Sequence, residues 1–189
     1  MILRNLFLII IFCHISGETA SNKAGVLQGQ LNTPLNDLGI EQAKLAGSRL
    51  KTTKFDSVFA SDLKRVLQTT AGIVKENECL QGITYFVCYF GLVQYCFPCS
   101  DIIHPILDAS FDDIVQTDAL IRERNFGVME GKPITEYVNA ANEAGIKKAY
   151  KFVPKGGESS TEVRERAKEF LKVSIQKNIR LQLYIDRFL

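Results

Sequence analysis

The chain has 189 residues, of which 46% are hydrophobic and 23% charged, and its formal net charge is +2. This apolar content is enough for a folded core and excludes a wholly disordered or collagen-like chain. Acidic and basic residues are interleaved, so the charge pattern does not favour a nucleic-acid partner, and the length predicts a single domain over residues 1–189.

The apolar run at residues 1–14 has two interpretations. A basic residue, Arg4, followed by the apolar stretch 6–12 is typical of a secretory signal peptide. A central strand of a parallel sheet, apolar on both faces, has the same pattern. The run is too short to span a membrane, and no small-x-small cleavage site follows it. We therefore expect a strand and a cytoplasmic protein, with a secreted or membrane-associated form as the alternative.

Residues 36–78 are typical of a helix, a strand and a second helix. Asn36 is expected to cap the first helix, and the alternation over 55–60 predicts a short strand. Ser61 is then expected to cap the second helix. The inner face of that helix is Leu63, Val66, Leu67, Thr70 and Val74. This order predicts an α/β fold with a largely parallel sheet.

The stretch 79–99 carries no charge and is rich in aromatic residues. It is long enough to span a membrane, but glutamines, glycines and a proline interrupt it and basic flanks are missing. We expect an atypical insert over 79–108 that leaves the sheet order unchanged. Cys96 and Cys99 form a C-x-x-C pair, yet the other cysteines and His104 lack zinc-site spacing, so no metal or cofactor is expected.

Charged residues return after the insert. We expect a loop at 120–127, a helix over 135–149 and a turn at 156–159. Ser159 and Glu162 have the spacing of a capping box at the start of a last helix. The inner face of that helix is Val163, Ala167, Phe170, Leu171 and Ser174.

Five short blocks, in a fixed order, resemble the histidine phosphatases of the phosphoglycerate-mutase-like superfamily. They are Gly17-Glu18-Thr19-x-x-Asn22, Pro34-Leu35-Asn36-x-x-Gly39-x-x-Gln42-Ala43, Ser61-Asp62-Leu63-x-Arg65-x-x-Gln68-Thr69, Arg122-Glu123-Arg124-Asn125-Phe126-Gly127-x-x-Glu130-Gly131-Lys132 and Gly156-Gly157-Glu158-Ser159. The loop 27–30 and the fourth block look most like TIGAR-type fructose 2,6-bisphosphatases. The resemblance covers about 17–78 and 118–175. It implies a three-layer sandwich with a mainly parallel central sheet.

The resemblance also implies a reaction: hydrolysis of a phosphomonoester of a sugar bisphosphate, such as the 2-phosphate of fructose 2,6-bisphosphate, in the regulation of glycolysis. In the family a histidine attacks phosphorus, giving phosphohistidine, and cationic groups neutralise the phosphoryl oxygens. The implied partner is a small phosphorylated substrate, with no nucleic acid and no membrane.

Individual roles follow from the same blocks. Arg65 is implied to bind phosphate; its alternative is a surface helix arginine. Glu123 is implied to be the proton donor and acceptor; its alternative is a surface carboxylate flanked by Arg122 and Arg124. The remaining residues implied to bind phosphate or substrate are Gly17, Asn22, Gln28 and Gly29. Asn22 could instead form a turn, and Gly29 could be an ordinary loop glycine. The site is expected at the carboxyl ends of the parallel strands.

Three departures from the family pattern put activity in doubt. Ile15 and Ser16 stand where the family has Arg-His, so Ser16 occupies the nucleophile position without an evident base. His14 lies about 6.6 Å further back along the expected strand. The chain also ends before the family's second histidine, which implies a fold lacking its C-terminal part. The third departure is the insert, which lengthens the gap between Arg65 and Glu123. Together the three departures suggest mis-spliced or mis-predicted segments. We expect an impaired phosphatase; the alternative is a non-catalytic relative that binds a phosphorylated ligand or a protein.

Overall fold

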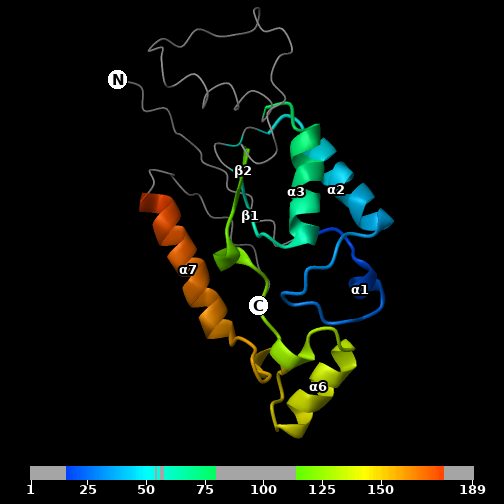
Figure 1. Cartoon of the computed structure of the whole chain (residues 1–189), viewed down its shortest axis with the longest axis vertical. Helices are drawn as coiled ribbons and strands as arrows, with labels where there is room; N and C mark the ends of the chain where they lie inside the picture. The colour runs from blue at the N-terminus through cyan, green and yellow to red at the C-terminus, as the bar shows by residue number, and fades with distance from the viewer. Residues whose placement is uncertain (1–15, 54, 56–57, 80–113, 177–189) are drawn as a thin grey trace, which may run out of the picture.

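A computed structural model of the chain describes residues 16–53, 55, 58–79 and 114–176. The expected first strand, most of the insert and the last thirteen residues lie outside this described part. Figure 1 shows the arrangement of the elements. Their bounds are α1 Ala20–Lys23, α2 Asp37–Arg49, β1 Val58–Ala60, α3 Lys64–Glu76, β2 Val115–Thr117, η2 Ala119–Ile121, η3 Gly127–Met129, α6 Ile134–Glu143, η4 Ala149–Lys151 and α7 Ser160–Gln176.

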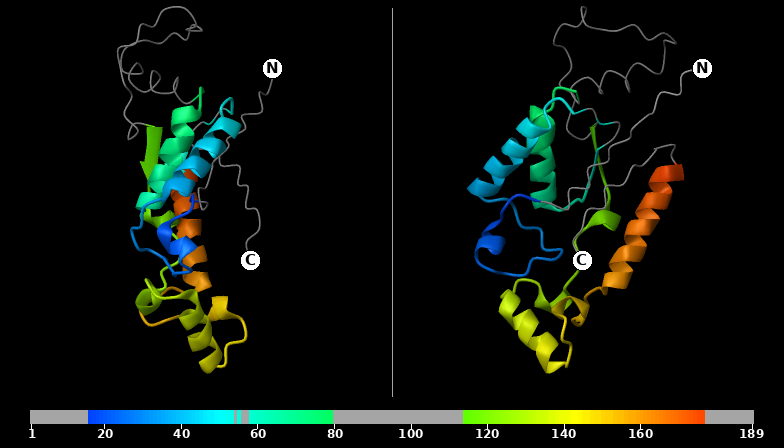
Figure 2. Two further views of the ribbon diagram at one scale, coloured as in Figure 1. Left: turned by 90° about the vertical axis from the view of Figure 1, so that its right-hand side faces the viewer. Right: turned by 180° about the vertical axis from the view of Figure 1, so that it is seen from behind.

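The two described strands form a parallel pair with helices on both faces. Val58 lies opposite Val115 in the ladder. Because side chains alternate along a strand, Val58 packs in the core beneath α3, whereas Phe59 packs against Phe170 of α7 with ring centroids 5.3 Å apart. Helices α2 and α3 thus lie on one side of the strands and α7 on the other (Figures 1 and 2). This three-layer arrangement confirms the expected α/β fold class.

Small residues bring α2 and α3 close together. A Cβ atom added at Gly72 would lie 2.8 Å from the Cβ of Ala43, and one added at Gly47 would lie 2.8 Å from the carbonyl oxygen of Gly72. Larger side chains at these points would push the helices apart. The contact fixes α3, whose first turn carries Arg65.

The start of the second helix differs from the sequence prediction. The Ser61 hydroxyl accepts a hydrogen bond from the N–H of Leu63 at 3.3 Å, and the helix begins only at Lys64. The N–H of Lys64 donates instead to Oδ1 of Asn32, at 2.6 Å. Ser61 as the helix cap was therefore wrong, because a side chain from a distant loop supplies the acceptor. Asn36 as the cap of α2 is confirmed, since it accepts from the N–H of Gly39 at 2.8 Å.

The later helices are partly as predicted. Helix α6 ends at Glu143, well before the expected residue 149, because Gly145 follows at a φ of 72° and reverses the chain. The capping box of α7 is confirmed: the N–H of Glu162 donates to the Ser159 hydroxyl at 3.2 Å, and the N–H of Ser159 donates to Glu162 at 2.7 Å.

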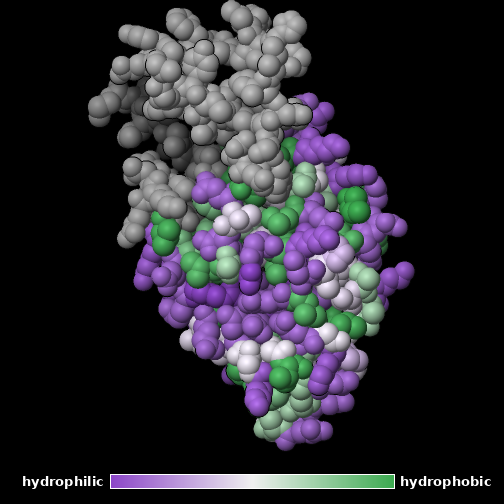
Figure 3. Space-filling model, viewed as in Figure 1, coloured by the Kyte–Doolittle hydropathy of each residue, from purple (hydrophilic) through white to green (hydrophobic). Residues whose placement is uncertain are grey.

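Polar residues cover most of the coloured part of the face in Figure 3, with apolar residues scattered among them. Within the described residues, no helix is both long enough and apolar enough to cross a membrane.

Candidate functional site

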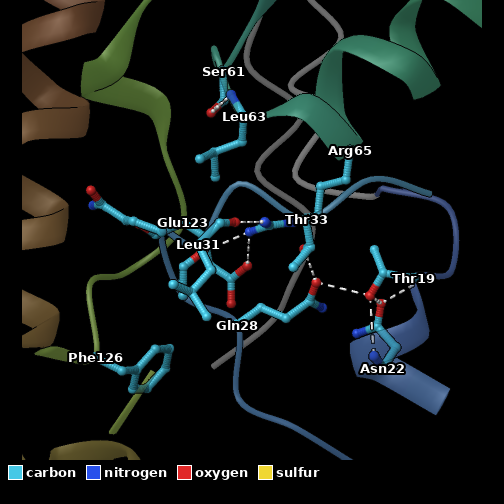
Figure 4. A network of polar contacts seen from close by, with 12 residues as sticks. Thr19, Asn22, Gln28, Leu31, Thr33, Ser61, Leu63, Arg65, Glu123 and Phe126 are labelled. Carbon is cyan, nitrogen blue, oxygen red and sulfur yellow. Dashed lines mark hydrogen bonds and ion pairs between the residues drawn. The ribbon is translucent and has the colours of Figure 1, made fainter. Parts of the chain in front are cut away.

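The guanidinium of Arg65 is the centre of the candidate site. It lies in the first turn of α3, and the residue is only 2% exposed. Its Nη1 donates to the carbonyl oxygen of Leu31 at 2.8 Å, and its Nη2 donates to that of Gly29 at 2.7 Å. Nη2 also contacts a carboxylate oxygen of Glu123 at 2.8 Å. A buried charge requires such partners, so Arg65 ties the loop 28–31 to Glu123 (Figure 4).

Glu123 reaches Arg65 from the segment that follows β2. Its side chain is 48% exposed, so the carboxylate lies between the buried guanidinium and solvent. Arg65 follows β1 in the same way, and the two strands are parallel. The structure therefore brings Arg65 and Glu123 together at the carboxyl ends of the strands, where the sequence placed the site. A carboxyl group beside a fixed guanidinium and open to solvent can act as a proton donor or acceptor.

The two arginines that flank Glu123 in sequence are bound elsewhere. Arg122 forms a two-pronged ion pair with Asp62, in which Nε donates to Oδ1 at 2.6 Å. The Arg122 guanidinium holds the pKa of the Asp62 carboxyl below its usual value, against the opposing effect of burial. Arg124 donates to the carbonyl oxygens of Tyr150, Phe152 and Glu158, at 2.6 Å each. The ion pair of Glu123 is thus made with Arg65, which the sequence separates from it by 58 positions.

The loop 28–31 has a tightly fixed backbone. Gln28 is buried, and its Oε1 accepts from the hydroxyls of Thr19, at 2.8 Å, and Thr33. Gly29 has a φ of 52°, and a Cβ added there would lie 2.1 Å from Oε1 of Glu130. The positive φ favours glycine, because L side chains rarely adopt this conformation, and a Cβ there would also have to displace the Glu130 side chain.

Gly17 lies where the expected first strand ends. Its N–H donates to the Thr69 hydroxyl at 3.1 Å, and that hydroxyl donates to the carbonyl oxygen of Arg65 at 2.7 Å. A Cβ on Gly17 would lie 2.3 Å from the carbonyl oxygen of Gly39 in α2. The backbone is therefore held against α2 and α3, and the half-buried Ser16 precedes it. His14 and Ile15 lie outside the described residues.

Asn22 serves as part of a helix cap. Its Oδ1 accepts from the N–H of Thr19 at 3.0 Å, and its own N–H donates to the Thr19 hydroxyl at 3.1 Å, which completes a capping box around α1. The turn-forming alternative therefore has its partners in the structure, whereas a contact between Asn22 and phosphate stays a prediction.

A second ion pair, between Glu158 and Arg166, borders the site. Arg166 Nε donates to Glu158 Oε1 at 2.9 Å, and the N–H of Asn125 donates to Glu158 Oε2 at 2.8 Å. Burial would raise the pKa of Glu158, but these two donors together hold its pKa below its usual value. The sequence marked Glu158 only as part of a block. Arg166 carried no signal, because Glu158 precedes the helix and no spacing rule joins them.

Metal-ligating residues do not gather at the site. Within the described part of the chain, no group of three or more His, Cys, Asp or Glu side chains is placed to hold a metal ion. Cys96, Cys99 and His104 lie outside that part.

The sequence matches the model of the histidine phosphatase superfamily (branch 1) over residues 9–84 and 102–181. One relative is the fructose-2,6-bisphosphatase TIGAR of Bos taurus, 33% identical over 161 residues, which cover 85% of this chain and 48% of that protein. Another is the fructose-2,6-bisphosphatase TIGAR B of Danio rerio, 36% identical over 162 residues, which cover 85% of this chain and 51% of that protein. The chain thus spans about half the length of these relatives.

Solved structures with the same fold include a mycobacterial glucosyl-3-phosphoglycerate phosphatase. It has a TM-score of 0.59 at 23% identity, over 86% of this chain and 61% of that chain. A phosphoglycerate mutase from Bacillus anthracis has a TM-score of 0.61 at 21% identity, over 87% of this chain and 67% of that chain. These likenesses confirm the phosphoglycerate-mutase-like fold.

Proposed function

Because the chain belongs to the histidine phosphatase superfamily, we propose that it is a phosphomonoesterase of the TIGAR type, acting at the Arg65 site. The proposed substrate is fructose 2,6-bisphosphate, cleaved at its 2-phosphate in the cytoplasm, in the regulation of glycolysis. The named activity of the TIGAR relatives supports this choice. The observation that carries the proposal is the buried guanidinium of Arg65, 2.8 Å from the half-exposed carboxylate of Glu123.

Phosphate binding follows from the way Arg65 is held. The carbonyl oxygens of Gly29 and Leu31 fix the guanidinium before any ligand arrives, so little side-chain freedom is lost on binding. A phosphoryl group offers the fork of N–H groups a stronger anionic partner than one carboxylate. It would compete with Glu123 for Nη2 and release that carboxyl group.

Proton transfer is the role proposed for the released carboxyl of Glu123. An alkoxide is a poor leaving group, so the sugar oxygen must gain a proton as the bond to phosphorus breaks. Glu123 is half-exposed and adjacent to the bound phosphoryl group, which allows it to take up a proton from solvent and to deliver it.

This chain departs from the family motif at the position of the nucleophile. Ser16 stands where the family motif has histidine, and a serine hydroxyl without a base is a weak nucleophile at neutral pH. We propose that turnover by this chain is therefore slower by orders of magnitude than turnover through phosphohistidine. Ser16 also favours a second candidate function, the binding of a phosphorylated ligand without hydrolysis.

The test is release of phosphate by the purified full chain from fructose 2,6-bisphosphate, fructose 1,6-bisphosphate and 2,3-bisphosphoglycerate. A variant carrying Ile15→Arg and Ser16→His restores the motif. It should form an acid-labile, base-stable phosphoenzyme and release phosphate at least about 100-fold faster than the unchanged chain. Arg65→Gln in the restored variant should abolish both signals, whereas Arg49→Gln, at an exposed position in α2, should not.

Two results would contradict the proposal. Equal and measurable rates of phosphate release for the unchanged and restored chains would show that Ser16 or His14 performs the attack. Failure of both chains to bind or cleave any of the three substrates would remove the phosphatase assignment, and binding without cleavage by both would support the second candidate function.

A further inference from the structure

We propose that Glu158 is a positioning residue for Glu123, a role that rests on the proposed function. Glu158 does not contact the carboxylate of Glu123. It holds two donor side chains, on Gln30 and Arg166, that fix the main chain of Glu123 beside Arg65.

The carbonyl oxygen of Glu123 accepts two hydrogen bonds from side chains. Gln30 Nε2 donates to it at 3.1 Å, and Arg166 Nη2 donates to it at 3.0 Å. A carbonyl oxygen has two acceptor sites, so both are used. The donors come from two different parts of the chain, the loop 28–31 and α7, and together they fix the position from which the Glu123 side chain extends.

Glu158 holds both of these donors. Arg166 donates to it twice, from Nε to Oε1 at 2.9 Å and from Nη2 to Oε2 at 3.1 Å. Gln30 Nε2 lies at 3.5 Å from Oε2, and the N–H of Asn125 donates to the same oxygen at 2.8 Å. Among the described residues, the hydrogen-bond partners of the Glu158 carboxylate are all donors, so an acceptor-only group fits there. A glutamine at position 158 would turn an NH₂ group toward N–H groups.

The arrangement couples Glu123 to the loop that holds Arg65. Gly29 and Leu31, on either side of Gln30, supply the carbonyl oxygens that bind the guanidinium. Gln30 thus connects the acceptors of Arg65 with the main chain of Glu123. The side chains of Arg166 and Glu158 are 15% and 24% exposed, so solvent screens their ion pair less than a surface pair. Loss of this pair should let the carboxylate of Glu123 move relative to Arg65.

Leaving-group dependence distinguishes positioning from general structural support. A proton donor is needed for a sugar alkoxide but hardly at all for 2,4-dinitrophenolate, which leaves unprotonated. In the chain with the restored Arg-His motif, we compare turnover of fructose 2,6-bisphosphate with that of 2,4-dinitrophenyl phosphate. Glu123→Gln and Glu158→Gln should each lower sugar-phosphate turnover about 10- to 100-fold more than aryl-phosphate turnover. Glu165→Gln, at an exposed residue of α7 that pairs with Lys168, should change neither rate.

The outcomes separate this inference from the proposed function. If Glu123→Gln shows the leaving-group effect but Glu158→Gln slows both substrates equally, or slows neither, Glu158 is not a positioning residue and the proposed function stands. If no form of the chain hydrolyses either substrate, the proposed phosphatase function fails. Binding of inorganic phosphate by the single and double variants, compared in a double-mutant cycle, then decides the inference.

In that cycle, removal or release of the Glu123 charge should strengthen phosphate binding at Arg65. Glu123→Gln and Glu158→Gln should each lower the Kd about two- to fivefold, and the double variant should bind no more tightly than Glu123→Gln alone. Additive effects, an unchanged Kd in Glu158→Gln, or no binding by any form would overturn the inference.

Discussion

Replacement of Arg65 by lysine keeps the positive charge but removes the planar fork. Arg65 makes two hydrogen bonds to the buried loop carbonyls of Leu31 and Gly29 and one to the half-exposed carboxylate of Glu123. A lysine ammonium at this site can reach one of the two carbonyls, because its three donors radiate from a single nitrogen. Hydrogen bonds to a charged group contribute about 1.5–3 kcal/mol each, and solvent screening makes the bond to Glu123 the weakest. We therefore expect Arg65→Lys to lower the free energy of unfolding by about 3 kcal/mol.

Urea unfolding followed by circular dichroism measures this loss. With an m-value of about 2 kcal/mol per molar urea, the midpoint should fall by about 1.5 M. Arg49→Lys is the matched control and should leave the midpoint unchanged, because Arg49 is exposed in the last turn of α2. A midpoint for Arg65→Lys that equals the control would refute the reasoning, since it would mean that the guanidinium contacts do not hold the loop 28–31 in solution.

Three further outcomes are expected. Asp62 has a pKa held below its usual value by Arg122, so its stabilising contribution is complete above the unfolded carboxyl pKa of about 4 and is lost as the pH falls through the folded value. Asp62→Asn should thus lose less stability than the unchanged chain between about pH 5 and pH 2, in urea midpoints taken across that range; parallel curves would contradict this. Gly39→Ala should destabilise the fold by at least about 2 kcal/mol more than Gly145→Ala, because its Cβ would lie 2.1 Å from a backbone carbonyl oxygen, whereas Gly145 has only a positive φ to overcome; equal unfolding free energies would sink the argument. Phe170→Ala should cost about 3–5 kcal/mol, because the ring fills the core between β1 and α7; a loss below about 1 kcal/mol would show that α7 does not pack there.

Local chemistry explains which elements the sequence could predict. Asn36 and Ser159 cap their helices because their side chains reach N–H groups three residues later. Such contacts can be predicted, because the two residues are close in sequence. Ser61 failed as a cap because Asn32, far away in sequence, supplies the acceptor for α3. Gly145 is a sequence signal for the early end of α6. The prediction of a helix over 135–149 gave more weight to the helical pattern than to this glycine.

The same distinction between local and distant contacts applies to the candidate site. The placement of Arg65 and Glu123 in one site followed from the family resemblance, because no periodicity links a residue of α3 to one that follows β2. Their ion pair was not predicted. The contacts of Gln30, Glu158 and Arg166 depend on how three segments meet in space, so only the folded chain could reveal them.

The direct pairing of β1 with β2 has a consequence for the chain that joins them. The register is fixed by contacts within the described layers, with Val58 opposite Val115 and Phe59 against Phe170. A strand parallel to β1 must enter from the same end as β1, so the chain after α3 returns to that end before it forms β2. This crossover puts the carboxyl ends of both strands at one edge and leaves Arg65 and Glu123 facing each other.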